Sequence, residues 1–197
     1  MQGANRLGGN GVANSTVFGA IAGDVMASWV KHQERRAPDE DILVSEQARA
    51  MHPFSQKPGD LNRLRERLYD VMWDDVGVIR DRGRLDRAIA ALDEIESELL
   101  ATGIPEDSRA FNLTWHDWLN LRSLCETSRV IALAAIRREN SRGAHFRSDF
   151  PESGDLHASR FTVVRQKDGA IEISDEPVLF THVSPGETLL KEQVAAE

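Results

Sequence analysis

An arginine stands inside a glycine-rich run at the start of the chain. Residues 3–11 read Gly-Ala-Asn-Arg-Leu-Gly-Gly-Asn-Gly, and Arg6 is the charged member. A helix-like pattern follows, and N–H groups at a helix start are unpaired and partly positive, which suits an anion or the polar edge of a ring. A nearby guanidinium can bind a carboxylate through two parallel hydrogen bonds. The spacing differs from the GxGxxG fingerprint and no strand precedes it, so taken alone it also allows a surface or structural role for Arg6.

A second candidate group is Ser-Arg-Gly-Ala-His at residues 141–145, which follows the most apolar helical segment. Gly143 suits a left-handed helix C-cap, and Arg142 and His145 could bind helix-end carbonyls, a neighbouring loop or a ligand. A structural clamp is the favoured interpretation. The other histidines are scattered without metal-ligand spacing, and the single Cys125 can form neither an internal disulfide nor a metal site alone. We therefore predict no metal site and expect Cys125 to be a small buried residue.

The overall composition is that of an ordinary globular protein. Hydrophobic residues make up 41% and charged residues 28%, and the formal net charge is −8. A negative chain argues against nucleic acid as the main partner, because phosphate binding needs a basic footprint. No apolar run reaches 18 residues and no signal peptide is visible, so we predict a cytoplasmic protein without a transmembrane segment.

Helical periodicity dominates the elements that would position these residues. Residues 12–33 predict a helix in which Gly19 and Gly23 stand among small and large apolar residues. Because glycine inside a helix costs about 1 kcal/mol relative to alanine, the pair suggests close approach to a flat ligand or, equally well, close packing against a sheet. A charged linker follows over 34–59, with one short helix expected near 39–52. From there, apolar residues recur at three- and four-residue intervals in three segments, which are 61–79, 85–99 and 114–139.

These three segments predict a small antiparallel bundle, because the connections between them are short. We expect Gly83 to separate the first two helices and Thr114 to be the N-cap of the third. Beyond residue 145 the pattern changes to β-prone runs on either side of Asp168-Gly169, which is a strong hairpin signal. A further short extended piece is expected at 178–180. The predicted fold class is mainly α, with a small β-hairpin tail.

Three segments together resemble one known family. The Gly3–Asn10 run, followed by Val17-Phe18-Gly19 and Ala22-Gly23, looks like the C-terminal FAD-contacting segment of succinate dehydrogenase and fumarate reductase flavoproteins, to which L-aspartate oxidase is similar. The stretch Glu139–Pro151, ENSRGAHFRSDFP, resembles the family's ESRGAH…DFP segment. Residues from Leu64-Arg65 to Arg80 resemble the first helix of the family's helical domain. The resemblance covers residues 3–151 in the family's order.

The resemblance implies a role for each matching residue. Arg6 matches the arginine that binds a carboxylate of succinate or fumarate. Gly11 and Val12 match the helix-start pair whose backbone meets the flavin ring, where a positive helix end favours negative charge on the reduced flavin. The remaining loop residues shape this site, and they are Gly8, Gly9 and Asn10. Arg142 and His145 match a motif with a structural role beside the active-site domain.

The resemblance also implies a division of the chain into four parts. Residues 1–35 would be the last loop and helix of an FAD-binding domain, and residues 36–59 a linker. Residues 60–147 would form the helical bundle domain and residues 148–197 a β-hairpin extension. The dinucleotide-binding unit and the catalytic proton donor of the family would lie upstream of this sequence, so no catalytic residue is expected here.

The implied function is hydride exchange between a dicarboxylate and FAD in the parent protein, with this chain alone inactive. The implied partners are the dicarboxylate, the N-terminal FAD domain and, in some relatives, an iron–sulfur subunit that would place the enzyme peripherally at the inner membrane. Three alternatives stay open: L-aspartate oxidation, a helical interaction module without chemistry, and one half of a split enzyme. Departures from the family pattern favour a divergent branch, and they stand at Gln2, at residues 11–14 and at 156–160.

Overall fold

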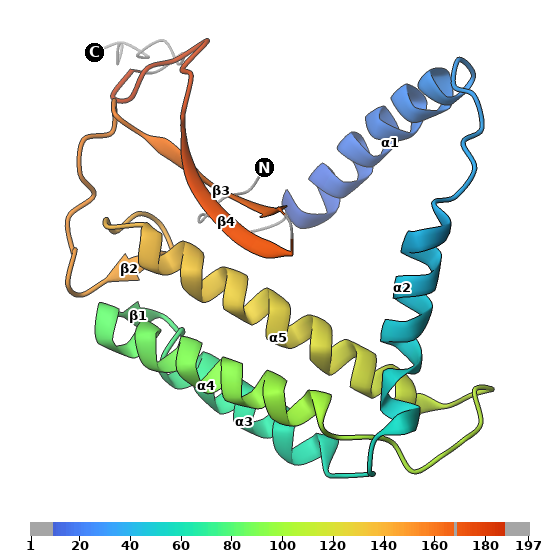
Figure 1. Ribbon diagram of the computed structural model, residues 1–197. Helices are drawn as coiled ribbons and strands as arrows, with labels where there is room; N and C mark the ends of the chain where they lie inside the picture. The colour runs from blue at the N-terminus through green and yellow to red at the C-terminus, as the bar shows by residue number, and fades with distance from the viewer. Residues whose placement is uncertain (1–9, 168, 188–197) are drawn as a thin grey trace, which may run out of the picture.

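The structure, a computed structural model, describes residues 10–167 and 169–187. The described part is mainly helical, with two small two-stranded sheets. The helices are α1 (Asn10–Val30), α2 (Glu40–Met51), the short 3-10 helix η1 (His52–Ser55), α3 (Leu61–Asp74), α4 (Arg82–Leu100) and α5 (Leu113–Arg137). The strands are β1 (Ile79–Arg80), β2 (Phe146–Arg147), β3 (Arg160–Lys167) and β4 (Ala170–Pro177). Figure 1 shows α3, α4 and α5 side by side, which confirms the predicted mainly α fold with a bundle and a hairpin.

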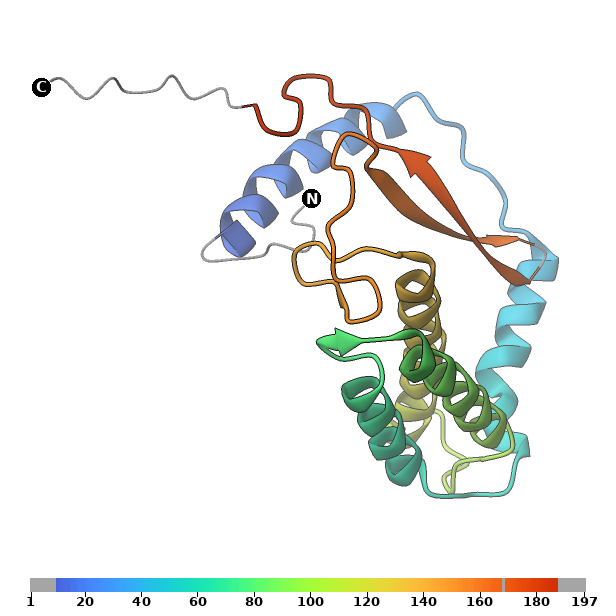
Figure 2. The same cartoon turned by 90° about the vertical axis from the view of Figure 1, so that its left-hand side faces the viewer.

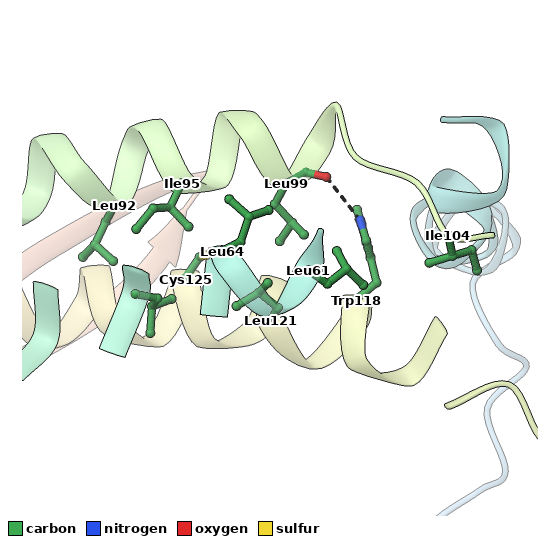
Figure 3. Close-up of a cluster of buried hydrophobic side chains, with 10 residues drawn as sticks. Leu61, Leu64, Leu92, Ile95, Leu99, Ile104, Trp118, Leu121 and Cys125 are labelled. Atoms are coloured by element: carbon green, nitrogen blue, oxygen red, sulfur yellow. Dashed lines mark hydrogen bonds between the residues drawn. The ribbon is translucent and has the colours of Figure 1, made fainter. Parts of the chain in front are cut away.

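The bundle core lies between α3, α4 and α5. Leucine and isoleucine side chains from the inner faces of these helices surround Trp118, which is fully buried (Figure 3). The indole Nε1 of Trp118 donates hydrogen bonds to the carbonyl oxygens of Thr102 at 2.8 Å and Leu99 at 3.2 Å, so its polar atom is paired inside the core. Full burial of a large apolar side chain contributes roughly 1.5–3 kcal/mol, so this layer supplies much of the bundle's stability. Cys125 is buried in the same cluster, and burial raises the pKa of its thiol to about 11.

A second, smaller cluster closes the other end of the bundle. Val76 and Leu85 pack there against three alanines, Ala88, Ala132 and Ala135. Alanine leaves room for close approach, so α4 and α5 can lie near one another where the chain leaves α5. This end of the bundle carries the 139–151 segment.

The helix starts correct two details of the sequence prediction. Asn112, not Thr114, caps α5, because the side-chain oxygen of Asn112 accepts the N–H of Trp115 at 2.8 Å. The side-chain amide of Asn112 donates to the carbonyl oxygens of Glu106 and Ser108, which holds the side chain in the capping position. Gly83 does not separate two helices but lies in the first turn of α4, because the carboxylate of Asp81 caps that helix by accepting the N–H of Arg84 at 2.9 Å.

The predicted hairpin is confirmed, and its strands are longer than expected. β3 and β4 pair antiparallel from Arg160 opposite Pro177 to Lys167 opposite Ala170. Gly169 in the turn has a φ of 79°, which favours glycine. Residues 178–180 form no strand in the described part of the chain. Figure 2 shows the segment of residues 138–159, which includes β2, running from the end of α5 to this hairpin.

Helix α1 stands apart from the bundle. It begins at Asn10 rather than at residue 12, and it is joined to α2 by an extended stretch over residues 33–39 (Figures 1 and 2). Asp39 caps α2, whose span agrees closely with the predicted short helix. Among the described helices, none has the length and hydropathy that crossing a membrane requires.

Candidate functional site

The first turn of α1 is largely exposed and carries no charged side chain. Val12 is 79% exposed, Gly11 is half-buried, and the turn contains no acidic residue. The hydroxyl of Ser15 donates to the Gly11 carbonyl and that of Thr16 to the Val12 carbonyl. Both hydroxyls therefore bind carbonyl groups, and neither accepts a hydrogen bond from a backbone N–H group of the first turn in these two contacts. A donor-rich helix start without a carboxylate fits an anionic or electron-rich group such as a flavin carbonyl edge. Arg6, Gly8 and Gly9 lie outside the described residues, as does the side chain of Asn10.

The long face of α1 is apolar and exposed. Phe18, Ile21, Val25 and Trp29 recur along it, and Trp29 is 63% exposed. Nothing lies within 4 Å of the position that a Cβ would take at Gly19 or Gly23. The predicted close packing of these glycines is therefore not made by the described part of this chain. An apolar stripe of this kind marks a surface that another molecule or domain covers.

Arg142 ties together the loop that follows the bundle. Its guanidinium donates to the carbonyl oxygens of Ser153 at 2.6 Å and Asp155 at 3.0 Å, and to the hydroxyl of Ser159 at 2.7 Å. Gly143, at a φ of 57°, makes the turn that returns the chain to His145. Arg142 thus holds residues 153–159 against the end of α5.

His145 lies half-buried between two elements. Arg80 donates to its Nδ1 at 3.0 Å, and its Nε2 lies 3.1 Å from the carbonyl oxygen of Arg138, which it can approach only as a donor. Burial lowers the pKa of His145, and the nearby cations Arg80, Arg138 and Arg147 lower it further, whereas the bond to the carbonyl opposes them. His145 is therefore a neutral bridge between α5 and the short parallel ladder in which Ile79 pairs with Phe146.

An ion pair between a buried arginine and an exposed aspartate lies at the centre of this motif, and the sequence reasoning did not identify it. Arg147 is 1% exposed and forms a two-pronged pair with Asp149, at 2.7 and 2.6 Å. The same guanidinium donates to the Ala135 and Ile136 carbonyls at the end of α5, while Asp149 accepts the Arg82 N–H at the start of α4. The hydrogen bonds from Arg147 hold the pKa of Asp149 down, at about 2.

Arg147 therefore compensates the partial negative charge at the C-terminal end of α5, and Asp149 the partial positive charge at the N-terminal end of α4. The signal of this pair in the sequence was an arginine and an aspartate two residues apart, one loop beyond the end of a long helix. No hydrogen bond or ion pair in the described part of the chain joins α1 to residues 139–151, so the two candidate groups are not brought together there. No set of three metal-ligating side chains occurs among the described residues.

Comparison with known proteins gives a consistent result. The family model described as "Fumarate reductase flavoprotein C-term" matches residues 65–190. An uncharacterized FAD-dependent oxidoreductase of Methanocaldococcus jannaschii is 35% identical over 78% of this chain and 27% of its own length. The fumarate reductase flavoprotein subunit of Mycobacterium tuberculosis is 32% identical over 95% of this chain and 34% of its own length.

Solved structures agree with the sequence matches. A chain of the Mycobacterium smegmatis Sdh1 complex in the apo form superposes with a TM-score of 0.78 at 30% identity, covering 90% of this chain and 30% of that one. The chain thus spans about a third of the length of the proteins it matches.

Proposed function

Because the chain belongs to the fumarate reductase flavoprotein C-terminal family, we propose that it is the C-terminal part of an FAD-dependent oxidoreductase that exchanges hydride between a dicarboxylate and flavin. The observation that carries the proposal is the run of residues 3–12, in which Arg6 stands in a glycine-rich sequence that leads into the acid-free start of α1. A guanidinium for one substrate carboxylate and helix-end donors for a flavin edge are two parts of such a site.

Each part has a separate task in the proposed reaction. Arg6 binds and orients the dicarboxylate through parallel hydrogen bonds, which fixes the substrate carbon that gives or receives hydride. The backbone N–H groups near Gly11 and Val12 face the flavin and stabilise negative charge on it. The loop residues Gly8, Gly9 and Asn10 allow the close approach of backbone to ligand. FAD, when bound, supplies the two-electron chemistry.

The proposal assigns residues 1–35 to the flavin-binding domain, 36–59 to a linker, 60–147 to the bundle and 148–197 to an extension. The exposed apolar face of α1 supports this division, because a domain that continues upstream would cover it. Arg142 and His145 then act as structural groups that shape the loop beside the active-site domain. The proposed setting is a cytoplasmic enzyme, peripheral to the membrane when an iron–sulfur subunit is present.

The chain by itself is proposed to be inactive. Hydride transfer needs its two reactants within about 3–3.5 Å in a closed site, and one arginine with one helix end does not enclose a substrate. The purified 197-residue chain should therefore show no flavin absorbance and no turnover of succinate or fumarate. A yellow preparation with a flavin spectrum would contradict this part of the proposal.

The test of the chemistry uses the complete flavoprotein that contains this chain. Arg6→Gln should lower kcat/KM for the dicarboxylate by about a hundredfold or more, because a bidentate charged contact is lost, while the flavin spectrum is retained. Arg36→Gln, in the exposed linker, removes the same charge and should leave kcat/KM unchanged. Assays on succinate, fumarate and aspartate separate the dicarboxylate proposal from amino-acid oxidation. Unchanged turnover in Arg6→Gln would favour a module without chemistry.

A further inference from the structure

A polar cavity lies between the end of α5, the loop after β2 and the β3–β4 hairpin. Its volume is about 120 Å³. Six charged side chains line it, and they are Arg137, Arg138, Arg142, Arg160, Glu139 and Asp175. Four guanidinium groups against two carboxylates leave a local excess of positive charge, in a chain whose formal net charge is −8. The cavity therefore carries local positive charge that attracts an anion, although the net charge of the chain is negative.

The four arginines differ in their hydrogen-bond and ion-pair partners. Arg137 donates twice to Asp175, at 3.0 and 2.7 Å, and Arg142 is held by the loop oxygens already described. The side chains of Arg138 and Arg160 make no hydrogen bond or ion pair with any of the described residues. A guanidinium carries five N–H donors in a planar fork that matches two oxygens of a carboxylate or phosphate. Arg138 and Arg160 are thus available for an oxyanion.

The negative end of α5 does not oppose such a ligand. The carbonyls of Ala135 and Ile136 accept hydrogen bonds from Arg147, and that of Arg138 accepts one from His145. The carbonyl groups of the last turn carry the partial negative charge of a helix end. Since these carbonyls are already paired, the field inside the cavity is set mainly by the arginines.

Asn140 adds a polar group that lacks a partner. Its side-chain Oδ1 is shielded from solvent and has no hydrogen-bond partner among the described residues, and Asn140 lines the cavity. The oxygen and nitrogen of a side-chain amide are nearly equal in size, so a half turn exchanges them. In that orientation the amide offers N–H donors to an oxyanion at the position where the oxygen has no partner.

We propose that this cavity binds a small oxyanion of the carboxylate or phosphate class, held by Arg138 and Arg160 with the amide of Asn140. The volume is well below the roughly 300 Å³ at which pockets for larger organic ligands begin, so the cavity is too small to enclose a nucleotide or flavin. The three proposed ligands lie directly after α5 and at the start of β3. The site does not depend on the proposed dicarboxylate chemistry at Arg6.

Isothermal titration of the 197-residue chain with sodium phosphate, and separately with sodium malonate, tests the site at constant ionic strength. Saturable binding with one anion per chain is expected, and the tighter of the two anions identifies the ligand class. The double substitution R138Q/R160Q should weaken Kd by about tenfold or more, because two charge-assisted contacts are lost. R165Q, on β3 and in an exposed pair with Glu176, removes one arginine outside the cavity and should change Kd by less than about twofold.

A second readout covers the case in which the double variant does not fold. In the unaltered chain, the side-chain Nε–H resonances of Arg138 and Arg160 should shift on addition of phosphate or malonate, and that of Arg165 should not. Absence of saturable heat with both anions overturns the proposal. Equal Kd in a folded R138Q/R160Q variant, or unshifted resonances at both arginines, overturns it as well.

Discussion

Helix α1 and the three-helix bundle have similar proportions of apolar residues and opposite environments. In the bundle, the apolar faces meet each other and Trp118 is fully buried, whereas in α1 the corresponding residues are exposed and Trp29 is 63% exposed. Within the described residues, the apolar faces of the bundle helices are thus covered and that of α1 is not. Helices that belong to one domain are recognised by apolar faces that pack against each other. Position in the sequence does not decide this, because α1 and the bundle helices belong to the same chain.

The largest expected effect separates these two helices directly. Trp118→Ala should lower the free energy of unfolding of the 197-residue chain by about 3–5 kcal/mol, because it removes a buried indole and leaves a cavity. Trp29→Ala should change it by less than about 0.5 kcal/mol, because the side chain is exposed. Urea unfolding followed by far-UV circular dichroism measures both. A loss of similar size for the two variants would show that α1 is packed against the bundle after all.

The next effect concerns the polar junction where α4, α5 and the 139–151 segment meet. Asp149→Asn should destabilise the bundle by about 2 kcal/mol, because the buried Arg147 guanidinium loses its countercharge, while the exposure of Asp149 screens part of the effect. Asp86→Asn removes an exposed partner of Arg82 and should change stability by less than about 1 kcal/mol. The same urea titration compares the two aspartates. Equal effects would mean that the Arg147–Asp149 pair contributes no more than a surface pair.

A smaller effect distinguishes the two candidate caps of α5. Asn112→Ala should lower stability by about 1 kcal/mol, because the N–H of Trp115 loses its acceptor. Thr114→Ala, inside the first turn, should be close to neutral. Thermal unfolding of the two variants decides between the cap seen in the structure and the one expected from sequence, and a larger loss at Thr114 would reverse the correction.

The smallest expected effect is a dependence of bundle stability on pH. The folded pKa of His145 lies below its ordinary value near 6.5, so the unfolded chain takes up this proton first. The contribution of His145 is therefore complete above about pH 6.5 and declines as pH falls below it. Replacing it in His145→Gln should flatten this decline between about pH 7 and pH 5, measured as the urea midpoint. An unchanged slope would place the dependence on other groups.

Asp149 acts in a separate window with the same sign. Its folded pKa of about 2 lies below the ordinary value of 3.8, so its contribution is present above about pH 4 and is lost as pH falls toward 2. The window of Asp149 lies below about pH 4. The decline near pH 6 therefore reports on His145 and not on the ion pair.

Local patterns in the sequence determined most of the architecture. The three- and four-residue recurrence of leucine and isoleucine indicated α3, α4 and α5, and Asp168-Gly169 between β-prone runs indicated the hairpin. These signals succeed because each depends on residues that are near in sequence and on one face of one element. The glycine-rich run with Arg6 and the ENSRGAHFRSDFP stretch were likewise sufficient for the family, which the comparisons confirm.

Only the tertiary structure decided how the 139–151 segment works. Arg147 meets Ala135 and Asp149 meets Arg82 because α4 and α5 pack with these ends together, and Arg80 reaches His145 across 65 positions of sequence. No periodicity encodes such pairings, since they depend on the relative placement of whole helices. The exposure of α1 is of the same kind. Its composition predicts a buried helix, and the described residues leave its apolar face uncovered.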